Sequence, residues 1–139
     1  MKINNVVVIG SGTMGSGIAA QLCNANIPVT LLDLKTEISQ KAKERIEKSR
    51  PPLLIDKSKI HGIKVGNISD DFKVVSEADW IVEAVVERID IKHEIYDKIF
   101  KERKKDSIVS SNTSSIPISV LSEKNDRGRQ KRFLYYAFF

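Results

Sequence analysis

The chain has 139 residues, of which 41% are hydrophobic and 29% are charged, and its formal net charge is +5. These values are typical of one soluble globular domain. No stretch approaches the roughly 18 consecutive apolar residues of a membrane span, and the single cysteine, Cys23, excludes a disulfide within the chain. Basic residues are interleaved with acidic ones, which indicates solvated helix faces and not a nucleic-acid site. The first apolar run begins too close to Met1 for a cleaved signal, so we expect a cytoplasmic protein.

The first strong pattern is a run of branched apolar residues that ends in glycine. Residues 6–9 are Val-Val-Val-Ile, and Gly-x-Gly-x-x-Gly follows at residues 10–15. An apolar run bounded by glycine predicts a strand buried on both faces, as in parallel sheets. Apolar residues then recur at helical spacing to about residue 26, and Cys23 is expected among them as a small core residue. The glycines therefore lie between a strand and a helix.

That position gives each glycine a physical role. Gly10 permits the tight turn, Gly12 lets a pyrophosphate approach the backbone, and Gly15 lets the helix pack closely on the strand. Thr13 and Met14 lie at the predicted helix N-terminus, whose N–H groups and partial positive charge attract phosphates. The stretch predicts a dinucleotide-binding turn.

A second apolar strand, residues 29–33, ends in an acid. Asp33 lies 18 residues after Gly15, where the carboxylate of a dinucleotide-binding unit accepts hydrogen bonds from the adenine ribose. A carboxylate there repels a 2′-phosphate, which favours NAD over NADP, and Lys35 weakens that preference without reversing it. The alternative is that Asp33 only caps the next helix.

The middle of the chain carries weaker signals. A charged helix is expected over residues 37–48, and Pro51 and Pro52 follow its end. Residues 53–66 are ambiguous, with a short helix around residues 56–61 and a short strand near residues 63–65. A further short helix is expected from residue 70 to about residue 78.

Two more strands complete the pattern, over residues 80–86 and 107–110. Glu87 follows the first of them, at the sheet edge where open α/β folds bind ligands. A helix to about residue 104 comes next, and a polar run, residues 111–115, follows the last strand before a short helix over residues 117–121. The serines of this run either cap that short helix or face a cofactor, and both can hold. The order of elements predicts an α/β fold with a doubly wound parallel sheet.

These segments together resemble the NAD-binding domain of 3-hydroxyacyl-CoA dehydrogenases. The resemblance rests on the glycine turn, on Asp33, on residues 79–87 (Asp-Trp-Ile-Val-Glu-Ala-Val-Val-Glu) and on residues 111–115 (Ser-Asn-Thr-Ser-Ser), and it covers roughly residues 3–123. It implies a Rossmann-type single domain with NAD as cofactor. It also implies oxidation of an L-3-hydroxyacyl-CoA substrate to the 3-ketoacyl-CoA, a step of fatty acid β-oxidation.

The resemblance also implies roles for individual residues. The glycine turn holds the pyrophosphate and Asp33 holds the ribose. Glu87 and Lys92 line the nicotinamide side of the cofactor site, and Asn112 also binds the cofactor. Ser114 binds the cofactor and hydrogen-bonds the substrate hydroxyl. For Lys92 the alternative is one more solvated charge on a helix. No metal site is expected.

The chain departs from the family pattern at its end. Ala137 stands where the family carries a catalytic histidine, and residues 124–139 form a basic, irregular link followed by an apolar tail. The tail is either a strand paired into the sheet or an exposed sticky end. The family's helical C-terminal domain is absent, so we expect a truncated or incomplete chain, a fragment. A positioned base contributes about 10²–10⁴-fold to such a reaction, and alanine supplies none of it.

Three hypotheses follow. In the first, the chain is the cofactor domain of a dehydrogenase and is weak or inactive alone. In the second, it is a non-catalytic NAD-binding module that acts with a partner chain carrying the missing domain. In the third, it is an unrelated nucleotide user such as an S-adenosylmethionine methyltransferase, whose fold also places an acid after a second strand.

Overall fold

The computed structural model describes residues 2–112 and 133–135. Within them, six parallel strands form one sheet in the order β3-β2-β1-β4-β5-β6. This is the strand order of dinucleotide-binding Rossmann folds, so the predicted doubly wound parallel sheet is confirmed. The strands are β1 (Val6–Ile9), β2 (Val29–Asp33), β3 (Ile63–Asn67), β4 (Trp80–Glu83), β5 (Ile108–Ser111) and β6 (Phe133–Tyr135).

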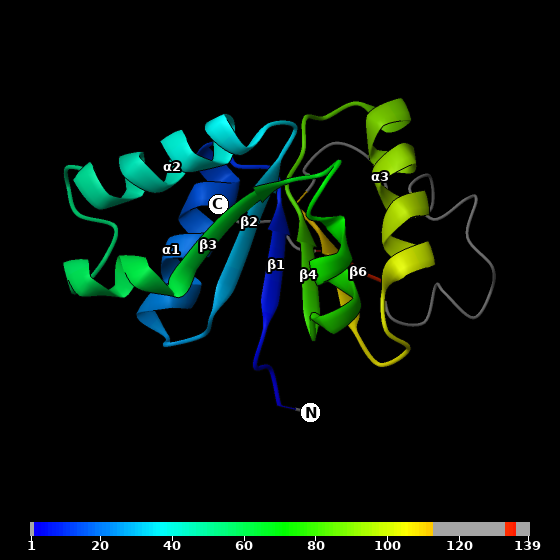
Figure 1. Cartoon of the computed structure of the whole chain (residues 1–139), viewed down its shortest axis with the longest axis horizontal. Helices are drawn as coiled ribbons and strands as arrows, with labels where there is room; N and C mark the ends of the chain where they lie inside the picture. The colour runs from blue at the N-terminus through cyan, green and yellow to red at the C-terminus, as the bar shows by residue number, and fades with distance from the viewer. Residues whose placement is uncertain (1, 113–132, 136–139) are drawn as a thin grey trace.

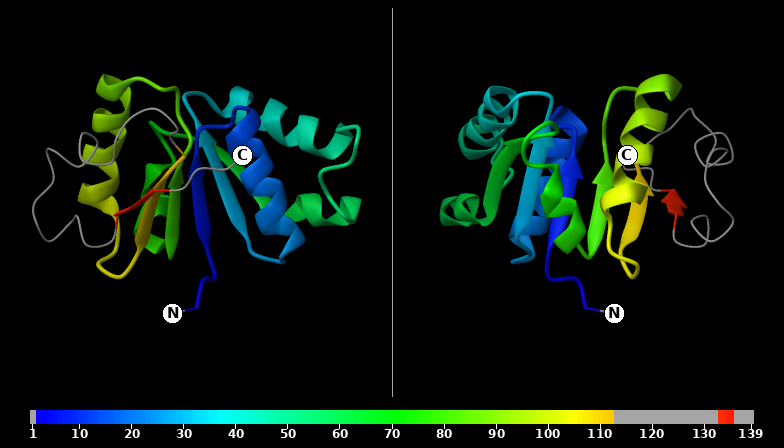
Figure 2. Two further views of the ribbon diagram at one scale, coloured as in Figure 1. Left: turned by 180° about the vertical axis from the view of Figure 1, so that it is seen from behind. Right: turned by 45° about the vertical axis from the view of Figure 1, so that its right-hand side comes forward.

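Helices cover both faces of the sheet (Figures 1 and 2). The α-helices are α1 (Thr13–Asn24), α2 (Thr36–Lys48) and α3 (Ile89–Glu102), and the 3₁₀ helices are η1 (Lys57–Gly62) and η2 (Phe72–Glu77). Helices α1, α2 and η1 pack against one face, and α3 and η2 pack against the other. Each βα unit crosses over to a parallel strand, and the two halves place their helices on opposite faces.

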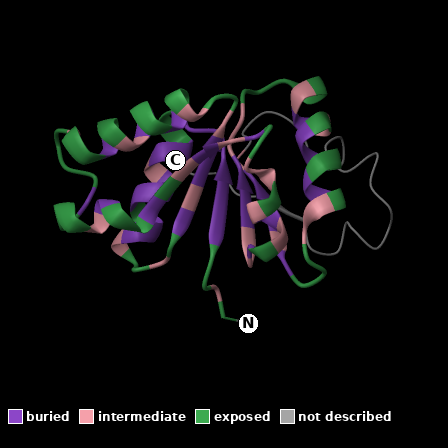
Figure 3. Cartoon of the chain, in the orientation of Figure 1, coloured by how far each residue is buried: buried purple, intermediate pink, exposed green. Residues whose placement is uncertain are grey.

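The central strand β1 shows why its sequence is apolar at every position. Val6 and Val8 belong to the core under α1 and α2, whereas Val7 and Ile9 belong to the core under α3. Because successive side chains of a strand point to opposite faces, a strand covered on both sides needs a continuous apolar run. The strands are accordingly the most buried part of the molecule (Figure 3).

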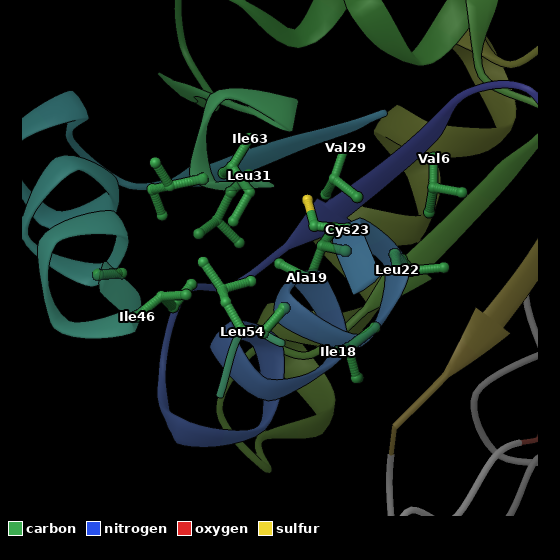
Figure 4. Close-up of a cluster of buried hydrophobic side chains, with 14 of the residues drawn as sticks. Val6, Ile18, Ala19, Leu22, Cys23, Val29, Leu31, Ile46, Leu54 and Ile63 are labelled. Carbon is green, nitrogen blue, oxygen red and sulfur yellow. The ribbon is translucent and has the colours of Figure 1, made fainter. Parts of the chain in front are cut away.

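The core under α1 contains the chain's cysteine, as predicted. Cys23 is 3% exposed and packs with residues of α1 and of the neighbouring strands (Figure 4). Burial raises the pKa of its thiol, so the neutral form is favoured. Cys23 therefore serves as a small apolar residue.

Most element boundaries agree with the sequence to within two residues, but β4 is shorter than predicted. It ends at Glu83, whereas a strand to Val86 was expected, and Val86 is 60% exposed. The backbone N–H of Val85 donates to the Glu83 side chain at 2.8 Å. The Glu83 carboxylate thus accepts the hydrogen bond from the Val85 N–H. In a longer strand this N–H would have bonded to a neighbouring strand. The short helices expected near residues 56–61 and 70–78 are both present as 3₁₀ helices.

The apolar tail contributes to the sheet. β6 pairs in parallel with β5, with Val109 opposite Phe133 and Ser111 opposite Tyr135. The strand-like alternative for the tail is confirmed over Phe133–Tyr135, and the sheet extends beyond the boundary expected after residue 123. The short helix expected over residues 117–121 lies outside the described residues. None of the described helices has the length and apolar character needed to cross a bilayer.

Candidate functional site

A pocket of about 990 Å³ opens at the carboxyl ends of β1, β2 and β4, between α2 and α3. This edge, at the point where the strand order reverses, is where open α/β sheets bind ligands. The pocket is lined by residues 10–14 of the glycine turn and by Asp33, Glu87 and Asn112. Predicted site residues from four separate segments are thus brought together around one cavity.

The glycine turn has the geometry that its sequence predicts. Gly10 has φ +104°, and a Cβ on it would lie 2.4 Å from the carbonyl oxygen of Ala84. A Cβ on Gly15 would lie 1.8 Å from the carbonyl oxygen of Gly10, so only glycine lets the helix approach so closely. A Cβ on Gly12 would meet nothing within 4 Å, because Gly12 faces the open pocket. The tight turn at Gly10 and the close approach at Gly15 are confirmed.

The start of α1 is open toward the same cavity. Gly12 is the N-cap residue and offers no side-chain acceptor, and the first backbone bond of the helix runs from Ser16 N–H to the Gly12 carbonyl at 2.9 Å. Thr13 and Met14 are exposed and line the pocket. Free N–H groups at a helix N-terminus form a site for an anion, so the turn and the helix fit a pyrophosphate.

Asp33 is tied to the glycine turn. Its Oδ2 accepts hydrogen bonds from the Ser11 backbone N–H at 2.8 Å and from Ser11 Oγ at 2.5 Å, and its Oδ1 accepts from Leu34 N–H at 2.7 Å. The N-cap residue of α2 is Lys35, so the alternative that Asp33 caps this helix is wrong. A carboxylate accepts about four hydrogen bonds, and Asp33 therefore keeps acceptor capacity toward the pocket.

Sequence reasoning missed Arg45. Its Nη2 donates to the Ser11 carbonyl at 3.1 Å, and its side chain lines the pocket beside Asp33. Arg45 belongs to the last turns of α2, where basic and acidic residues alternate, and nothing in that local pattern distinguishes it from a solvated charge. Only the packing of α2 beside the glycine turn brings it to the site.

Sequence reasoning also missed a buried polar network below the β4 end of the pocket. Glu83 is fully buried, and its Oε1 accepts from Tyr96 OH at 2.5 Å and from Ser111 Oγ at 2.8 Å. Its Oε2 accepts from Lys92 Nζ at 2.7 Å and from Val85 N–H at 2.8 Å. Four donors from α3, β5 and the loop after β4 thus converge on one carboxylate. One feature of the sequence could have indicated this network. Glu83 is an acid inside an otherwise apolar predicted strand, and a buried carboxylate requires a hydrogen-bond or ion partner.

Lys92 connects this network to the pocket. Its Nζ lies 2.7 Å from Glu83 Oε2 and 3.1 Å from Glu87 Oε1, and the lysine side chain is 0% exposed. The alternative that Lys92 is a solvated charge is wrong. Glu87 is 38% exposed and lines the pocket, so Lys92 reaches the cavity through Glu87.

Tyr96 completes the network as a neutral donor. Burial, and then the charge of Glu83, raise the pKa of the Tyr96 phenol well above its usual range. The phenol O–H therefore stays available to the Glu83 carboxylate. Every buried side-chain N and O atom of the described residues has a hydrogen-bond partner, which makes this part of the site rigid.

The polar run after β5 divides between the network and the pocket. Ser111 is buried against Glu83, whereas Asn112 lines the pocket and its backbone N–H donates to the Glu83 carbonyl at 2.8 Å. The cofactor-facing interpretation therefore fits Asn112. Ser114 and Ala137 lie outside the described residues, and the role of Ser114 stays a prediction.

The comparisons with known proteins agree with this geometry. Residues 5–139 match the family described as "3-hydroxyacyl-CoA dehydrogenase, NAD binding domain". The chain belongs to this family. NAD is accordingly the cofactor of the domain, and the methyltransferase alternative is set aside. The glycine turn, the open α1 N-terminus and Asp33 all fit an NAD molecule.

Individual relatives place the chain within longer proteins. It is 41% identical to a probable 3-hydroxyacyl-CoA dehydrogenase of Deinococcus radiodurans, covering 100% of this chain and 42% of the relative. It is 39% identical to a putative fatty acid oxidation complex trifunctional enzyme of Rickettsia felis, covering 99% and 20%. The solved (S)-3-hydroxybutyryl-CoA dehydrogenase of Ralstonia eutropha superposes with a TM-score of 0.81 at 28% identity, covering 99% and 50%. The chain thus spans half or less of each of these proteins.

Proposed function

We propose that this chain supplies the NAD-binding half of an enzyme that oxidises an L-3-hydroxyacyl-CoA to the 3-ketoacyl-CoA. The observation that supports this most directly is the pocket, where the glycine turn, Asp33, Glu87 and Asn112 meet at one edge of the sheet. When bound, NAD accepts the hydride that leaves the substrate's hydroxyl-bearing carbon. The protein's part is to bind and orient the two molecules.

In this proposal each segment of the pocket holds one part of the cofactor. The glycine turn and the start of α1, with Thr13 and Met14, hold the pyrophosphate, and Asp33 holds the adenine ribose. Glu87, Lys92 and Asn112 form the nicotinamide side. Ser114 hydrogen-bonds the substrate hydroxyl and orients it toward the ring.

The proton of the hydroxyl needs a base, and Ala137 provides none at the position where the family carries histidine. We therefore propose that this chain binds NAD but turns over slowly by itself. The D. radiodurans relative is longer, and this chain spans 42% of it. A polypeptide equivalent to the rest of that relative would supply the acyl side of the site, and this chain would then be a module acting with a partner.

Titration with NAD and with S-adenosylmethionine tests the cofactor, and reduction of a 3-ketoacyl-CoA by NADH, followed at 340 nm, tests the reaction. We expect saturable NAD binding, no binding of S-adenosylmethionine, and weak turnover that rises when the C-terminal part of the D. radiodurans relative is added. Failure to bind NAD would overturn the proposed function. Rapid turnover by the chain alone would overturn the proposed role of Ala137.

A place in fatty acid β-oxidation and a cytoplasmic location are part of the same proposal. The name of the R. felis relative, a putative fatty acid oxidation complex trifunctional enzyme, supports the pathway. Comparing turnover across acyl-CoA chain lengths tests the place in β-oxidation, and cell fractionation tests the cytoplasmic location. A reaction with non-CoA alcohols only would contradict the pathway.

A further inference from the structure

Arg45 brings a positive charge from α2 to the pocket. Its Nη2 donates to the Ser11 carbonyl at 3.1 Å, and its side chain lines the cavity. Helix α2 lies beside α1 on one face of the sheet, which is how a residue of α2 reaches the turn that precedes α1 (Figure 1). A guanidinium has five N–H donors in a planar fork. After the bond to Ser11, the other donors of Arg45 remain available to a ligand.

The sequence of α2 gives Arg45 no acidic neighbour at helical spacing. The residues three and four positions away along the chain are Lys41, Ala42, Lys48 and Ser49. Side chains at these spacings are the ones that meet on a helix surface. The ion pairs found among the described residues do not include Arg45. Its charge is therefore not neutralised by a carboxylate of its own helix.

Ser11 holds Arg45 and Asp33 close to each other. The N–H and Oγ of Ser11 donate to Asp33 Oδ2, at 2.8 and 2.5 Å, whereas its carbonyl accepts from Arg45. An anion and a cation thus flank a single residue at the β2 end of the pocket. The other charged residues among the described ones that line the cavity lie in the loop after β4 and on α3, and they are Glu87, Glu94 and Lys98.

The proposed function places the adenine ribose at this β2 end. In dinucleotide-binding folds an acid here binds the ribose hydroxyls of NAD, and an arginine nearby accommodates the 2′-phosphate of NADP. This chain has both residue types at one place. The Asp33 carboxylate already accepts three hydrogen bonds, from Ser11 and from Leu34 N–H, and these donors offset part of the charge that repels a phosphate. Lys35 and Glu37, both exposed at the start of α2, add one charge of each sign.

We propose that Arg45 binds the 2′-phosphate of NADP, so that the domain accepts NADP as a second cofactor beside NAD. Hydrogen bonds from a guanidinium to a phosphate are charge-assisted, and the planar fork suits two phosphate oxygens. Asp33 still repels the phosphate, so NAD stays the tighter ligand, and Arg45 limits the difference between the two. The inference rests on the proposed function, which puts the ribose beside Asp33.

The test is the ratio of two dissociation constants, Kd for NADP divided by Kd for NAD, measured by isothermal titration calorimetry on the full chain. For the unsubstituted chain this ratio should lie below about one hundred. Arg45→Met keeps an apolar stem and removes the guanidinium, and it should raise the ratio about ten- to a hundredfold. The matched control is Lys48→Met, which removes an exposed cation from the last turn of the same helix and should leave the ratio unchanged.

Two further measurements separate phosphate binding from support of the glycine turn. Arg45→Lys keeps a positive charge without the planar fork, so its ratio should lie between those of the unsubstituted chain and Arg45→Met. Adenosine 2′,5′-bisphosphate and adenosine 5′-monophosphate differ only in the 2′-phosphate, and Arg45→Met should weaken binding of the first more than of the second. The Ser11 carbonyl keeps a hydrogen bond from Ser16 Oγ, at 2.9 Å, when Arg45 is replaced.

A purely structural role for Arg45 gives a different result. A looser turn would weaken NAD and NADP equally, and an unchanged ratio in Arg45→Met would overturn the proposal. An equal change in Lys48→Met, or no measurable binding of NADP to the unsubstituted chain, would overturn it as well. Circular dichroism establishes whether Arg45→Met folds, and if it does not, the ratio of Arg45→Lys decides the question. Failure of the unsubstituted chain to bind NAD would contradict the proposed function itself and is therefore distinguishable.

Discussion

The two ends of the pocket are built by different means. The end at β1 and β2 is made of backbone, with glycines that leave space, a helix N-terminus, and one partly exposed carboxylate, Asp33. The end at β4 and β5 is made of buried charged and polar side chains around Glu83. In the proposed function, the first end recognises phosphates and a ribose, which every dinucleotide carries. The second end would face the part of the cofactor that reacts, where a fixed arrangement of charges affects the chemistry.

The difference predicts that the two ends respond differently to substitution, and the largest effect belongs to the buried end. Lys92→Met removes the ammonium and leaves the Glu83 carboxylate, which is 0% exposed, without its ion partner. Breaking a buried pair in this way costs about 3–5 kcal/mol. Urea unfolding followed by circular dichroism measures the loss in the free energy of unfolding.

The matched control is Lys101→Met, which removes an exposed lysine from the same helix. It should change the free energy of unfolding by no more than about 0.5 kcal/mol. Equal effects of the two substitutions would mean that the Glu83–Lys92 pair does not support the fold, and the contrast between the two ends would then be lost.

The adenosine end should respond through binding. Asp33→Ala removes charge-assisted hydrogen bonds worth about 1.5–3 kcal/mol, so the affinity for NAD should fall about ten- to a hundredfold. The gap between NAD and NADP should narrow, because the carboxylate that repels a 2′-phosphate is gone. Calorimetric titration with both cofactors gives the four dissociation constants. Unchanged NAD binding would show that Asp33 serves only the bonds to Ser11.

The same contrast explains what could be predicted from the sequence. The glycine turn and Asp33 follow from local pattern, because an apolar run, a fixed glycine spacing and an acid after the next strand specify their own geometry. The end of β4 and the role of Glu83 do not follow from local pattern. Its partners Lys92, Tyr96 and Ser111 are 9, 13 and 28 residues away in the chain, and only the packed fold brings them together.

A similar limit applies to Arg45 and to β6. Arg45 contacts the Ser11 carbonyl across 34 residues, from a helix whose charged pattern is ordinary. The sequence of the tail is compatible with a strand paired into the sheet or with an exposed apolar end. The parallel pairing of Phe133–Tyr135 with β5 shows that this part of the tail is a strand. Sequence patterns specify elements, whereas contacts between distant elements depend on how the sheet assembles.

Within the glycine turn, two neighbouring glycines separate folding from binding. Gly15→Ala places a Cβ 1.8 Å from the Gly10 carbonyl oxygen, so the backbone must shift, and such overpacking costs about 1–3 kcal/mol of stability. A Cβ on Gly12→Ala meets nothing within 4 Å, so its cost is limited to the poorer N-cap preference of alanine, about 0.5–1 kcal/mol.

Gly12→Ala should affect NAD binding more than it affects stability. Its new methyl group projects into the pocket where the pyrophosphate approaches, so NAD affinity should fall while the protein stays folded. Thermal unfolding and NAD titration of both variants measure the two effects. A Gly12→Ala variant that binds NAD normally would mean that the cofactor's phosphates lie elsewhere.

The smallest expected effect lies at the amino ends of the strands and contrasts a partly exposed carboxylate, Asp79, with the fully buried Glu83. A hydrogen bond from Lys104, and then the N–H groups of Asn4 and Asn5, lower the pKa of Asp79 to about 2. A carboxylate whose pKa is lower in the folded state stabilises the fold above its unfolded pKa, and that stabilisation is lost as pH falls through the folded value. Asp79→Asn should therefore be less stable than the unsubstituted chain at pH 7, and the difference should shrink between about pH 4 and pH 2.

Urea unfolding across this pH range measures the difference in the free energy of unfolding, and Asp97→Asn, at an exposed carboxylate of α3, is the control. A difference independent of pH would mean that Asp79 acts through hydrogen bonds that an amide reproduces poorly, and not through its charge.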